Sequence, residues 1–190
     1  LIRVDSNQFF YVEKNGEYLI VGDMYQAKSF GFVAVVDEST LEMRKNSIKK
    51  VLKKNMIIFP SPSKARDILY VFTDVDCHFC RKFHNDALPN LSSAGVEVRY
   101  LAYPRAGTNS ESYKKMASAW CADDKNKALS KLKNGEIIDE YICDENPISN
   151  QIDLGQKIGI TGTPAMLTED GTLLMGYRPA NKLLEIIANH

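Results

Sequence analysis

The chain has 190 residues, 44% of them hydrophobic, so it is long enough to bury the core of one or two domains. Its 24 basic and 24 acidic residues give zero net charge, which argues against nucleic acid as the main partner, because phosphate binding requires a basic surface. No apolar run approaches the ~18 residues of a membrane span. Since the chain starts at Leu1 instead of Met, we expect a mature or trimmed product.

Residues 1–38 predict a small unit of short strands. Two apolar segments, 9–12 and 18–21, flank Asn15-Gly16, and Asn-Gly is the preferred pair for a tight hairpin turn. A third apolar segment covers residues 30–36. Because a unit of this size buries little apolar surface by itself, we expect it to pack against a partner.

A helix is predicted after this unit. Ser39 is followed three residues later by Glu42, which is the capping-box pattern of a helix start, and the helix is expected to end near Asn55. Its many basic residues could contact a membrane or nucleic acid, but a solvated face is the simpler interpretation. We therefore assign residues 39–57 as a linker helix.

An α/β pattern continues from residue 58 to residue 190. The predicted elements are a strand at 68–73, a helix from 77 to about 91, a strand at 96–103, mainly helical structure at 109–158 with breaks at 134–135 and near 147, strands at 165–168 and 172–175, and a last helix from 179. This order, with a helical segment ahead of the final hairpin, is typical of the thioredoxin fold. The predicted fold class is therefore α/β, with residues 58–190 as the catalytic domain.

Cys77 and Cys80 are separated by two residues and follow closely after the predicted strand at 68–73. Two cysteines at this spacing can form a disulfide and open it again. The unpaired backbone N–H groups at the start of the following helix favour a thiolate on the first sulfur, and the thiolate is the attacking species. We expect Cys77 to be exposed and to attack, and Cys80 to be more buried and to resolve the intermediate.

Three neighbours are candidates for tuning the redox properties of this pair. A protonated His78 favours a Cys77 thiolate by its charge, whereas Asp76 opposes the thiolate if its carboxylate lies close to the sulfur. Phe79 fits an apolar rim better than a chemical role. The sequence leaves open whether His78 or Asp76 has the larger effect.

Thr163 and Pro164 form a candidate substrate-binding segment. If the bond between them is cis, the backbone of Thr163 can face the two sulfurs and pair with an extended substrate as an added strand. The alternative is an ordinary trans proline that opens a strand.

The two remaining cysteines, Cys121 and Cys143, have two interpretations. They could form a bridge, whose persistence implies an oxidising compartment, or they could be separate buried thiols.

Other uses of the first cysteine pair are weaker. A zinc site is disfavoured because its four candidate ligands crowd eight residues instead of forming two separated pairs; they are Cys77, His78, Cys80 and His84. Haem attachment is disfavoured because Arg81 occupies the position where that motif has histidine. Asp74 could carry a proton for Cys80, but a solvated carboxylate near the helix start is the simpler interpretation. We expect no metal and no other cofactor.

These motifs resemble the DsbC/DsbG family of bacterial periplasmic disulfide isomerases, and its DsbC members more than its DsbG members. The matches are spread over residues 68–180, with a looser similarity near the start of the chain. The matching stretches are Phe72-Thr73-Asp74 leading into Cys77 and Cys80, Tyr100-Leu101-Ala102-Tyr103-Pro104-Arg105, Trp120-Cys121-Ala122, Lys125-Asn126-Lys127-Ala128, Gly162-Thr163-Pro164-Ala165, Gly176-Tyr177, and near the start Tyr18-Leu19-Ile20 and Gly22-Asp23-Met24-Tyr25.

The resemblance implies a thioredoxin-like catalytic domain, a cis bond before Pro164 and a structural disulfide between Cys121 and Cys143. It also implies a homodimer joined through N-terminal dimerisation domains, with two active sites facing a cleft that binds misfolded proteins. The redox pair of the family is kept reduced by a membrane donor of the DsbD type, and the family is periplasmic.

Three departures from the family pattern bear on these expectations. His78-Phe79 replaces the usual Gly-Tyr or Pro-Tyr pair, and Asp76 precedes the first cysteine. The segment ahead of the linker helix is shorter than in the family and lacks an initial helix. We therefore expect either a dimer built with exchanged segments or a truncated chain.

The predicted function is that of a periplasmic thiol:disulfide isomerase and reductase, which rearranges incorrect disulfides in other proteins through Cys77 and Cys80. The alternatives are a net dithiol oxidant, a holdase-type chaperone whose cleft holds unfolded chains, and a zinc-binding structural protein.

Overall fold

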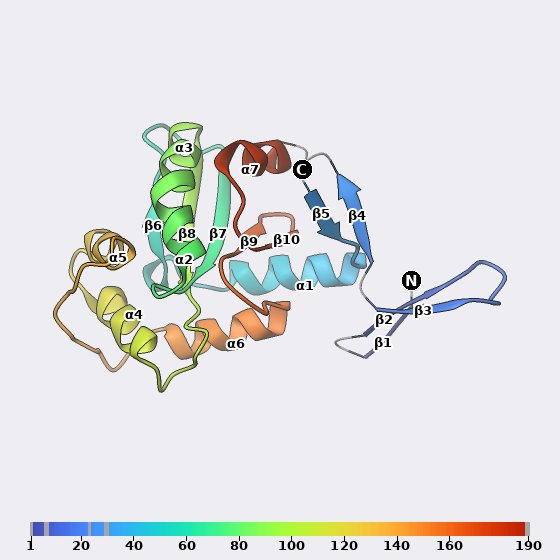
Figure 1. Ribbon diagram of the computed structural model, residues 1–190, viewed down its shortest axis with the longest axis horizontal. Coiled ribbons are helices and arrows are strands. Elements are labelled where there is room, and N and C mark those ends of the chain that lie inside the picture. The colour runs from blue at the N-terminus through green and yellow to red at the C-terminus, as the bar shows by residue number, and fades with distance from the viewer. Residues whose placement is uncertain (1, 6–7, 23, 29–30, 189–190) are drawn as a thin grey trace.

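A computed structural model describes residues 2–5, 8–22, 24–28 and 31–188 of the chain. Figure 1 shows a body in which helices flank a central sheet, and an N-terminal group of strands that extends away from this body. None of the helices in the described ranges is both long and apolar enough to cross a membrane.

Five strands form the central sheet, in the order β10-β9-β7-β8-β6. They are β6 (Ile57–Phe59), β7 (Asp67–Thr73), β8 (Val96–Ala102), β9 (Ala165–Thr168) and β10 (Leu173–Met175). β7 is parallel to β8, and the other pairs are antiparallel. The second half of β7 is fully buried, as expected for a central strand with helices on both faces.

Alternate residues of β7 point to opposite faces of the sheet, and each face has its own core. Leu69 and Val71 belong to one core, to which α3, α4, α5 and α7 contribute, whereas Tyr70 and Phe72 belong to the other, to which α1 and the end of α6 contribute. These helices are α1 (Glu38–Lys49), α3 (Leu88–Ser93), α4 (Glu111–Cys121), α5 (Lys125–Lys133), α6 (Ile148–Ile158) and α7 (Ala180–Ile187). The core is therefore built around the strand that leads into the two cysteines.

The connection from β7 to β8 is the helix predicted from the cysteine pair onward. It consists of α2 (His78–Lys82), a π-helical turn η2 (Phe83–Ala87) and α3. Figure 1 shows these three segments as one continuous run in front of the sheet. This connection places Cys77 at the carboxyl end of the central strand, and the predicted α/β class is confirmed.

The helical insertion between β8 and β9 contains α4, α5 and α6. The predicted break at Asn134-Gly135 is present, because α5 is capped at Asn134 and Gly135 has a φ of 83°. A second break, at residues 122–124 between α4 and α5, was not predicted. The insertion therefore has three helices with a non-helical segment at 134–147.

The N-terminal unit has two separate groups of strands. β1 (Ile2–Asp5), β2 (Gln8–Val12) and β3 (Leu19–Val21) form one antiparallel sheet, and β4 (Tyr25–Lys28) pairs with β5 (Gly31–Ala34). The predicted hairpin is confirmed, since Val12 pairs with Leu19 and Gly16 in its turn has a φ of 76°. β1 and β4 were not predicted, and the Phe30 end of the third apolar segment lies outside the described residues.

The linker helix differs from its prediction at both ends. Its N-cap is Asp37, whose carboxylate accepts a hydrogen bond from the Thr40 N–H at 2.7 Å, so the capping-box start at Ser39 is wrong. The Asp37 carboxylate is as good an N-cap acceptor as a serine hydroxyl and lies two residues earlier, so the helix begins from there. α1 ends at Lys49, and a short 3₁₀ turn η1 (Lys53–Asn55) leads into β6, an edge strand that was not predicted.

Candidate active site

Cys77 lies just beyond the end of β7 and is the N-cap residue of α2. Its carbonyl oxygen accepts the first helical hydrogen bonds, from the N–H groups of Cys80 at 3.1 Å and Arg81 at 3.0 Å. The unpaired N–H groups of the first turn and the positive end of the helix dipole therefore lie next to this residue, and both favour negative charge there.

Both thiols are free, and both residues are buried. Cys77 retains 4% of its accessible surface and Cys80 retains none. The expectation that Cys77 is exposed is therefore wrong, because the distant segment at Thr163 covers it. The expected difference in accessibility between the two cysteines is present, since Cys77 is the more accessible.

The covering segment is the loop before β9. The peptide bond between Thr163 and Pro164 is cis, and the carbonyl oxygen of Thr163 accepts a hydrogen bond from the Cys77 thiol at 3.3 Å. The carbonyl of Pro164 accepts the N–H of Gly176 at 2.9 Å, which ties the loop to the residue after β10. The Thr163 hydroxyl is buried and has no hydrogen-bond partner among the described residues.

The pKa values of the two thiols are shifted in opposite directions. The hydrogen bond from Cys80 is the largest cause lowering the pKa of Cys77 to about 5, and Thr163 and the positive charge of Arg105 add to it while burial opposes it. Burial raises the pKa of Cys80 well above its ordinary value, and the hydrogen bond with Cys77 raises it further. At neutral pH the arrangement therefore holds a thiolate on Cys77 and a thiol on Cys80.

Asp76 lies beside the cysteine pair in a cluster of charged side chains. Its carboxylate is 2.9 Å from the ammonium of Lys115 and 3.4 Å from the guanidinium of Arg81. These two cations offset its negative charge, which would otherwise oppose a thiolate on Cys77. The largest influences on the pKa of Cys77 come from other groups, so neither Asp76 nor His78 dominates it.

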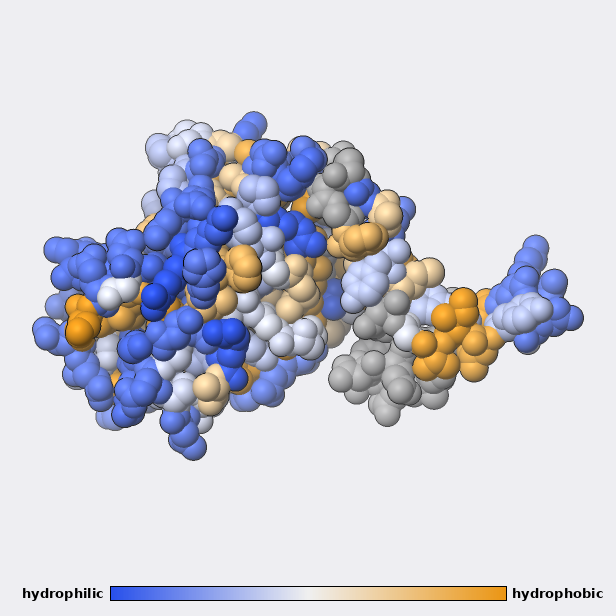
Figure 2. Space-filling view, in the orientation of Figure 1, coloured by the Kyte–Doolittle hydropathy of each residue, from blue (hydrophilic) through white to orange (hydrophobic). Residues whose placement is uncertain are grey.

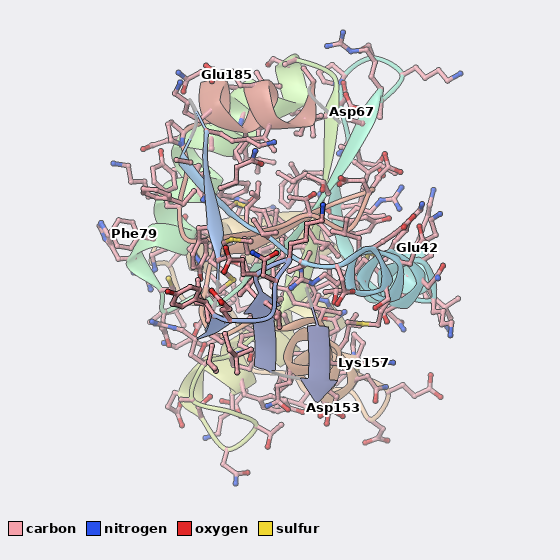
Figure 3. The ribbon with its side chains drawn as sticks, turned by 90° about the vertical axis from the view of Figure 1, so that its right-hand side faces the viewer. Glu42, Asp67, Phe79, Asp153, Lys157 and Glu185 are labelled. Atoms are coloured by element: carbon pink, nitrogen blue, oxygen red, sulfur yellow. A yellow bond between two sulfur atoms is a disulfide. The ribbon has the colours of Figure 1, made fainter. Side chains whose placement is uncertain are left out.

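His78 and Phe79 form part of an exposed aromatic rim. Their rings meet edge to face at 5.5 Å between centroids, and the Phe79 ring stacks on Tyr177 at 6.3 Å. Phe79 is 54% exposed, and Figure 3 shows it at the edge of the molecule, pointing outward. Tyr177 follows β10, so the rim joins the helix of the cysteine pair to the segment after the hairpin.

Asp74 is buried and engaged in hydrogen bonds at the end of β7. Its carboxylate accepts from the Ser112 hydroxyl, from the Arg105 guanidinium at 3.1 Å and from the Arg105 N–H at 3.0 Å. Burial raises the pKa of Asp74, but these hydrogen bonds outweigh it and lower the pKa. A carboxylate stabilised in this way is a poor proton acceptor.

A buried lysine behind the pair was not predicted from the sequence. Lys133, at the end of α5, is only 1% exposed, and its Nζ donates to the Thr73 hydroxyl at 2.5 Å and to the Asp74 carbonyl at 3.1 Å. The only signal in the sequence was its position four residues after Leu129, on the apolar face of the helix.

His84, a candidate zinc ligand from the sequence, is held by other partners. Its ring nitrogens lie 3.1 Å from the Tyr100 hydroxyl and 3.1 Å from the Ser130 hydroxyl. Burial, helped by the positive charge of Lys133, lowers the pKa of His84 to about 4, so the ring is neutral at pH 7. Within the described ranges no group of three or more His, Cys, Asp or Glu side chains is arranged to hold a metal ion.

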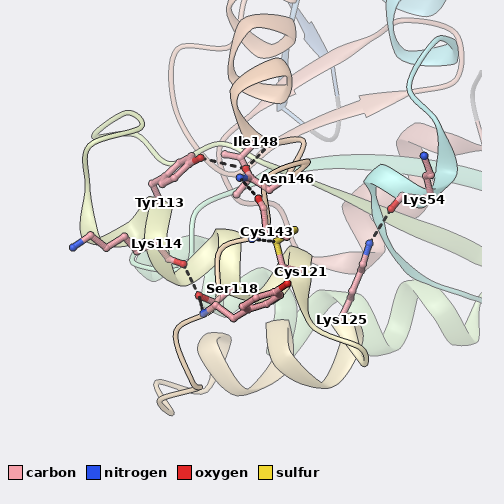
Figure 4. The surroundings of a disulfide bond; sticks show 10 residues. Lys54, Tyr113, Lys114, Ser118, Cys121, Lys125, Cys143, Asn146 and Ile148 are labelled. Atoms are coloured by element: carbon pink, nitrogen blue, oxygen red, sulfur yellow. Dashed lines mark hydrogen bonds between the residues drawn. A yellow bond between two sulfur atoms is a disulfide. The ribbon is translucent and has the colours of Figure 1, made fainter.

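Cys121 and Cys143 are joined by a disulfide, away from the free pair. The bond links the end of α4 to the non-helical segment after α5, as Figure 4 shows. Nearby, the Cys143 N–H donates to the Cys121 sulfur at 3.0 Å and the Tyr141 N–H donates to the Ser118 hydroxyl at 3.0 Å. The bridge therefore fixes a long segment that has no secondary structure of its own.

Comparison with known sequences gives two concordant results. A family model described as a thioredoxin-like domain matches residues 46–190. The thiol:disulfide interchange protein DsbC of Escherichia coli K12 is 34% identical over 180 residues, which cover 95% of this chain and 73% of that protein. The DsbC protein of Dickeya dadantii is 33% identical over 185 residues, covering 97% and 74%.

Comparison with solved structures agrees with the sequence comparisons. A disulfide interchange protein from Neisseria gonorrhoeae superposes with a TM-score of 0.64 at 28% identity, covering 73% of this chain and 97% of that one. The catalytic domain of Proteus mirabilis ScsC superposes with a TM-score of 0.66 at 20% identity over 81% of this chain and 98% of that one, which shows a shared fold.

The fold and the free cysteine pair define a thiol–disulfide exchange enzyme with a thioredoxin-like domain. Within that class, the chain belongs to the DsbC family of thiol:disulfide interchange proteins.

Proposed function

We propose that this protein is a periplasmic isomerase and reductase of disulfides in other proteins, with Cys77 and Cys80 as its catalytic residues. The observation that carries the proposal is the opposite shift of the two thiol pKa values, down for Cys77 and up for Cys80, beside the cis peptide at Thr163. Membership of the DsbC family supports the reaction class and the periplasmic location.

Exchange begins with the Cys77 thiolate. It attacks one sulfur of an incorrect substrate disulfide, a mixed disulfide forms, and the other substrate sulfur leaves as a thiolate. In isomerisation, a different thiolate of the substrate then attacks the mixed disulfide, a new substrate disulfide forms, and Cys77 is released as a thiolate. No electrons are gained or lost overall.

Reduction uses the same mixed disulfide. Cys80 attacks the Cys77 sulfur, a Cys77–Cys80 disulfide forms, and the substrate leaves with both sulfurs reduced. The enzyme has then lost two electrons to the substrate, and a membrane donor of the DsbD type is proposed to restore them.

Thr163 and Pro164 are proposed to hold an extended substrate segment. The carbonyl of Thr163 faces Cys77, and β9 begins directly after Pro164, so a substrate backbone lying along this loop reaches the sulfur in an extended conformation. His78, Phe79 and Asp76 are proposed to tune the pair at its rim, where Phe79 offers an exposed ring to apolar substrate side chains.

Homodimer formation is proposed through residues 1–38, with 39–57 as linker and 58–190 as catalytic domain. Apolar side chains on β3 and β4 are more than half exposed, and Figure 2 shows the hydrophobic patch on the extended N-terminal strands; the residues are Leu19, Ile20, Val21 and Tyr25. A unit of such short strands leaves these side chains in water unless a second copy covers them, by simple pairing or by exchanged segments. The boundary at 57/58 falls within β6.

Two other functions have a specific observation in their favour. The exposed apolar strands also suit a holdase that binds unfolded chains. The strongly stabilised Cys77 thiolate favours the reduced form of the pair, and an enzyme whose reduced form is stabilised is an oxidant of other thiols. A variant lacking both thiols, Cys77→Ser with Cys80→Ser, tests the first by suppression of aggregation. Equilibration of the pair with glutathione tests the second.

Refolding of a scrambled protein with several disulfides tests the main proposal. Cys77→Ser is expected to abolish activity, because no mixed disulfide can form. Cys80→Ser is expected to keep isomerisation by the substrate's own thiol but to lose reduction. Undiminished refolding with Cys77→Ser contradicts the assignment.

A further inference from the structure

Lys133 has no part in the exchange steps described above, although it is buried behind the cysteine pair. Lysine is almost never fully buried unless its charge is compensated, so its position requires an explanation. Building on the proposed function, we infer that Lys133 accepts the proton of Cys80 when Cys80 attacks the mixed disulfide, and returns it later to solvent.

The hydrogen bonds of Lys133 fit a neutral amine. A neutral amine has two N–H donors and one lone pair, whereas an ammonium has three donors and no lone pair. Among the described residues, Nζ has two hydrogen-bond acceptors, the Thr73 hydroxyl and the Asp74 carbonyl. Two donors are therefore satisfied, and the lone pair remains for a proton.

The surroundings also bring the pKa of this amine closer to neutral pH. Burial is the largest influence and lowers the pKa of Lys133, the negative charges of the nearby sulfurs and Asp74 offset part of this effect, and the resulting pKa is about 8. The ring of Tyr100 lies 6.0 Å from Nζ. Charged or titratable groups face Nζ from four elements. They are Asp74 at the end of β7; Cys77, Cys80 and Arg81 from α2 and its N-cap; His84 from η2; and Tyr100 from β8.

The remaining acid–base groups are less suited to the same step. The Asp74 carboxylate is occupied by Ser112 and Arg105 and has a lowered pKa. The ring of His84 is engaged at both nitrogens by Tyr100 and Ser130, and its pKa is also lowered. Once it has taken the proton, Lys133 carries the positive charge that lowers the pKa of Cys80, so it stabilises the thiolate that the transfer leaves behind.

Proton transfer from Cys80 to Lys133 prepares the attack on the mixed disulfide. The Cys80 thiol and the Lys133 amine become a thiolate and an ammonium, and the thiolate attacks the Cys77 sulfur of the mixed disulfide. The Cys77–Cys80 bond forms, the bond to the substrate breaks, and the substrate sulfur leaves as a thiolate. Because Cys77 is no longer a thiolate in the mixed disulfide, one cause that raises the pKa of Cys80 is removed before this transfer.

The test follows the two halves of one turnover with the disulfide dimer of thionitrobenzoate. Attack by Cys77 releases the first coloured thionitrobenzoate, and attack by Cys80 on the mixed disulfide releases the second. Lys133→Met replaces the amine with an apolar chain of similar length. Lys127→Met, at an exposed position of the same helix, is the matched control.

With Lys133→Met, the second release is expected to slow about a hundredfold, the size of a typical general-base contribution, while the first is unchanged. In the wild type the second rate should rise with pH to a plateau at or below about pH 8, and in the variant it should rise without a plateau. A second release with unaltered rate and pH profile in Lys133→Met overturns the inference. Absence of the first release in the wild type counts against the proposed function instead.

A titration of the wild-type protein keeps the inference testable if Lys133→Met does not fold. With carbon-labelled lysine, one lysine side chain of the full chain should titrate at or below about pH 8 in nuclear magnetic resonance spectra. Titration of every lysine above pH ~9, near the ordinary value, overturns it.

Discussion

The sulfur of Cys77 lies 3.3 Å from the carbonyl oxygen of Thr163, although 86 positions separate the two residues in the chain. This contact joins the two motifs on which the exchange reaction depends. It also explains why the attacking sulfur is covered in the free protein, since the same loop occupies the position beside it.

Alkylation of the reduced protein should follow the titration of Cys77. Because its pKa is lowered to about 5, modification should fall only as the pH drops through that value, and Cys80 should stay unmodified. Cys80→Ala removes the largest cause of the lowering, so the midpoint should move up toward the ordinary thiol value. Mass spectrometry of the modified peptides checks both. A midpoint above pH ~8 in the wild type contradicts the assignment.

The stability of the reduced protein should depend on pH through the same thiol. The pKa of Cys77 is lower in the folded chain than in the unfolded chain, so its thiolate contributes stability in full above the unfolded value of about 8.5. That contribution should decline as the pH falls and vanish below about 5. Urea unfolding of the reduced wild type and of Cys77→Ser should converge at low pH. A constant difference between them sinks the prediction.

Removal of the second cysteine pair should weaken the fold. The Cys121–Cys143 bond closes a loop with a sequence separation of 22, which in the chain-entropy description stabilises by about 3 kcal/mol. The double variant Cys121→Ala with Cys143→Ala should unfold at lower urea concentration, while the first release of thionitrobenzoate is retained. Unchanged stability would mean that the segment at 134–147 is ordered without its bridge.

Gly171 should tolerate no side chain. It turns between β9 and β10 with a φ of 93°, and a Cβ there would clash with the backbone carbonyl of Leu41 in α1. Gly107 has a similar φ of 77° but open space around it, so Gly107→Ala reports the conformational cost alone. Gly171→Ala should cost at least about 1 kcal/mol more than this control in urea unfolding. Equal costs would show that α1 moves aside freely.

The proposed dimer should depend on the apolar N-terminal strands. Ile20 in β3 is 66% exposed and Ile137 in the helical insertion is 93% exposed, so they form a matched pair. Ile20→Glu should convert a two-chain assembly to one chain in light scattering and reduce isomerisation, whereas Ile137→Glu should do neither. Retention of the two-chain mass by Ile20→Glu contradicts an interface on β3.

Features encoded by neighbouring residues could be predicted from the sequence. The Asn15-Gly16 turn, the strand before the cysteine pair and the strand at 165–168 were all confirmed, because turn chemistry and short apolar runs act locally. The start of α1 was wrong because Asp37 and Ser39 both suit an N-cap, and only the fold decides between them.

The environment of the sulfurs could not be predicted in this way. The burial of Cys77 depends on a loop at residue 163, and the position of Lys133 depends on packing of α5 behind β7. The approach of Thr163 to the sulfurs was expected only if its bond to Pro164 was cis, which the residues alone did not decide. Lys133 left no local pattern, because a lysine at the end of a helix is usually in water. Pairing of Cys121 with Cys143 was likewise implied only by the family resemblance.

One folded chain thus holds a closed cystine between residues 121 and 143 and an open dithiol between residues 77 and 80. The proposed reaction therefore places opposite demands on the two pairs, since the former must be oxidised and the latter must be reduced before Cys77 can attack. An environment that is uniformly oxidising or uniformly reducing would leave one of the two pairs in the wrong state.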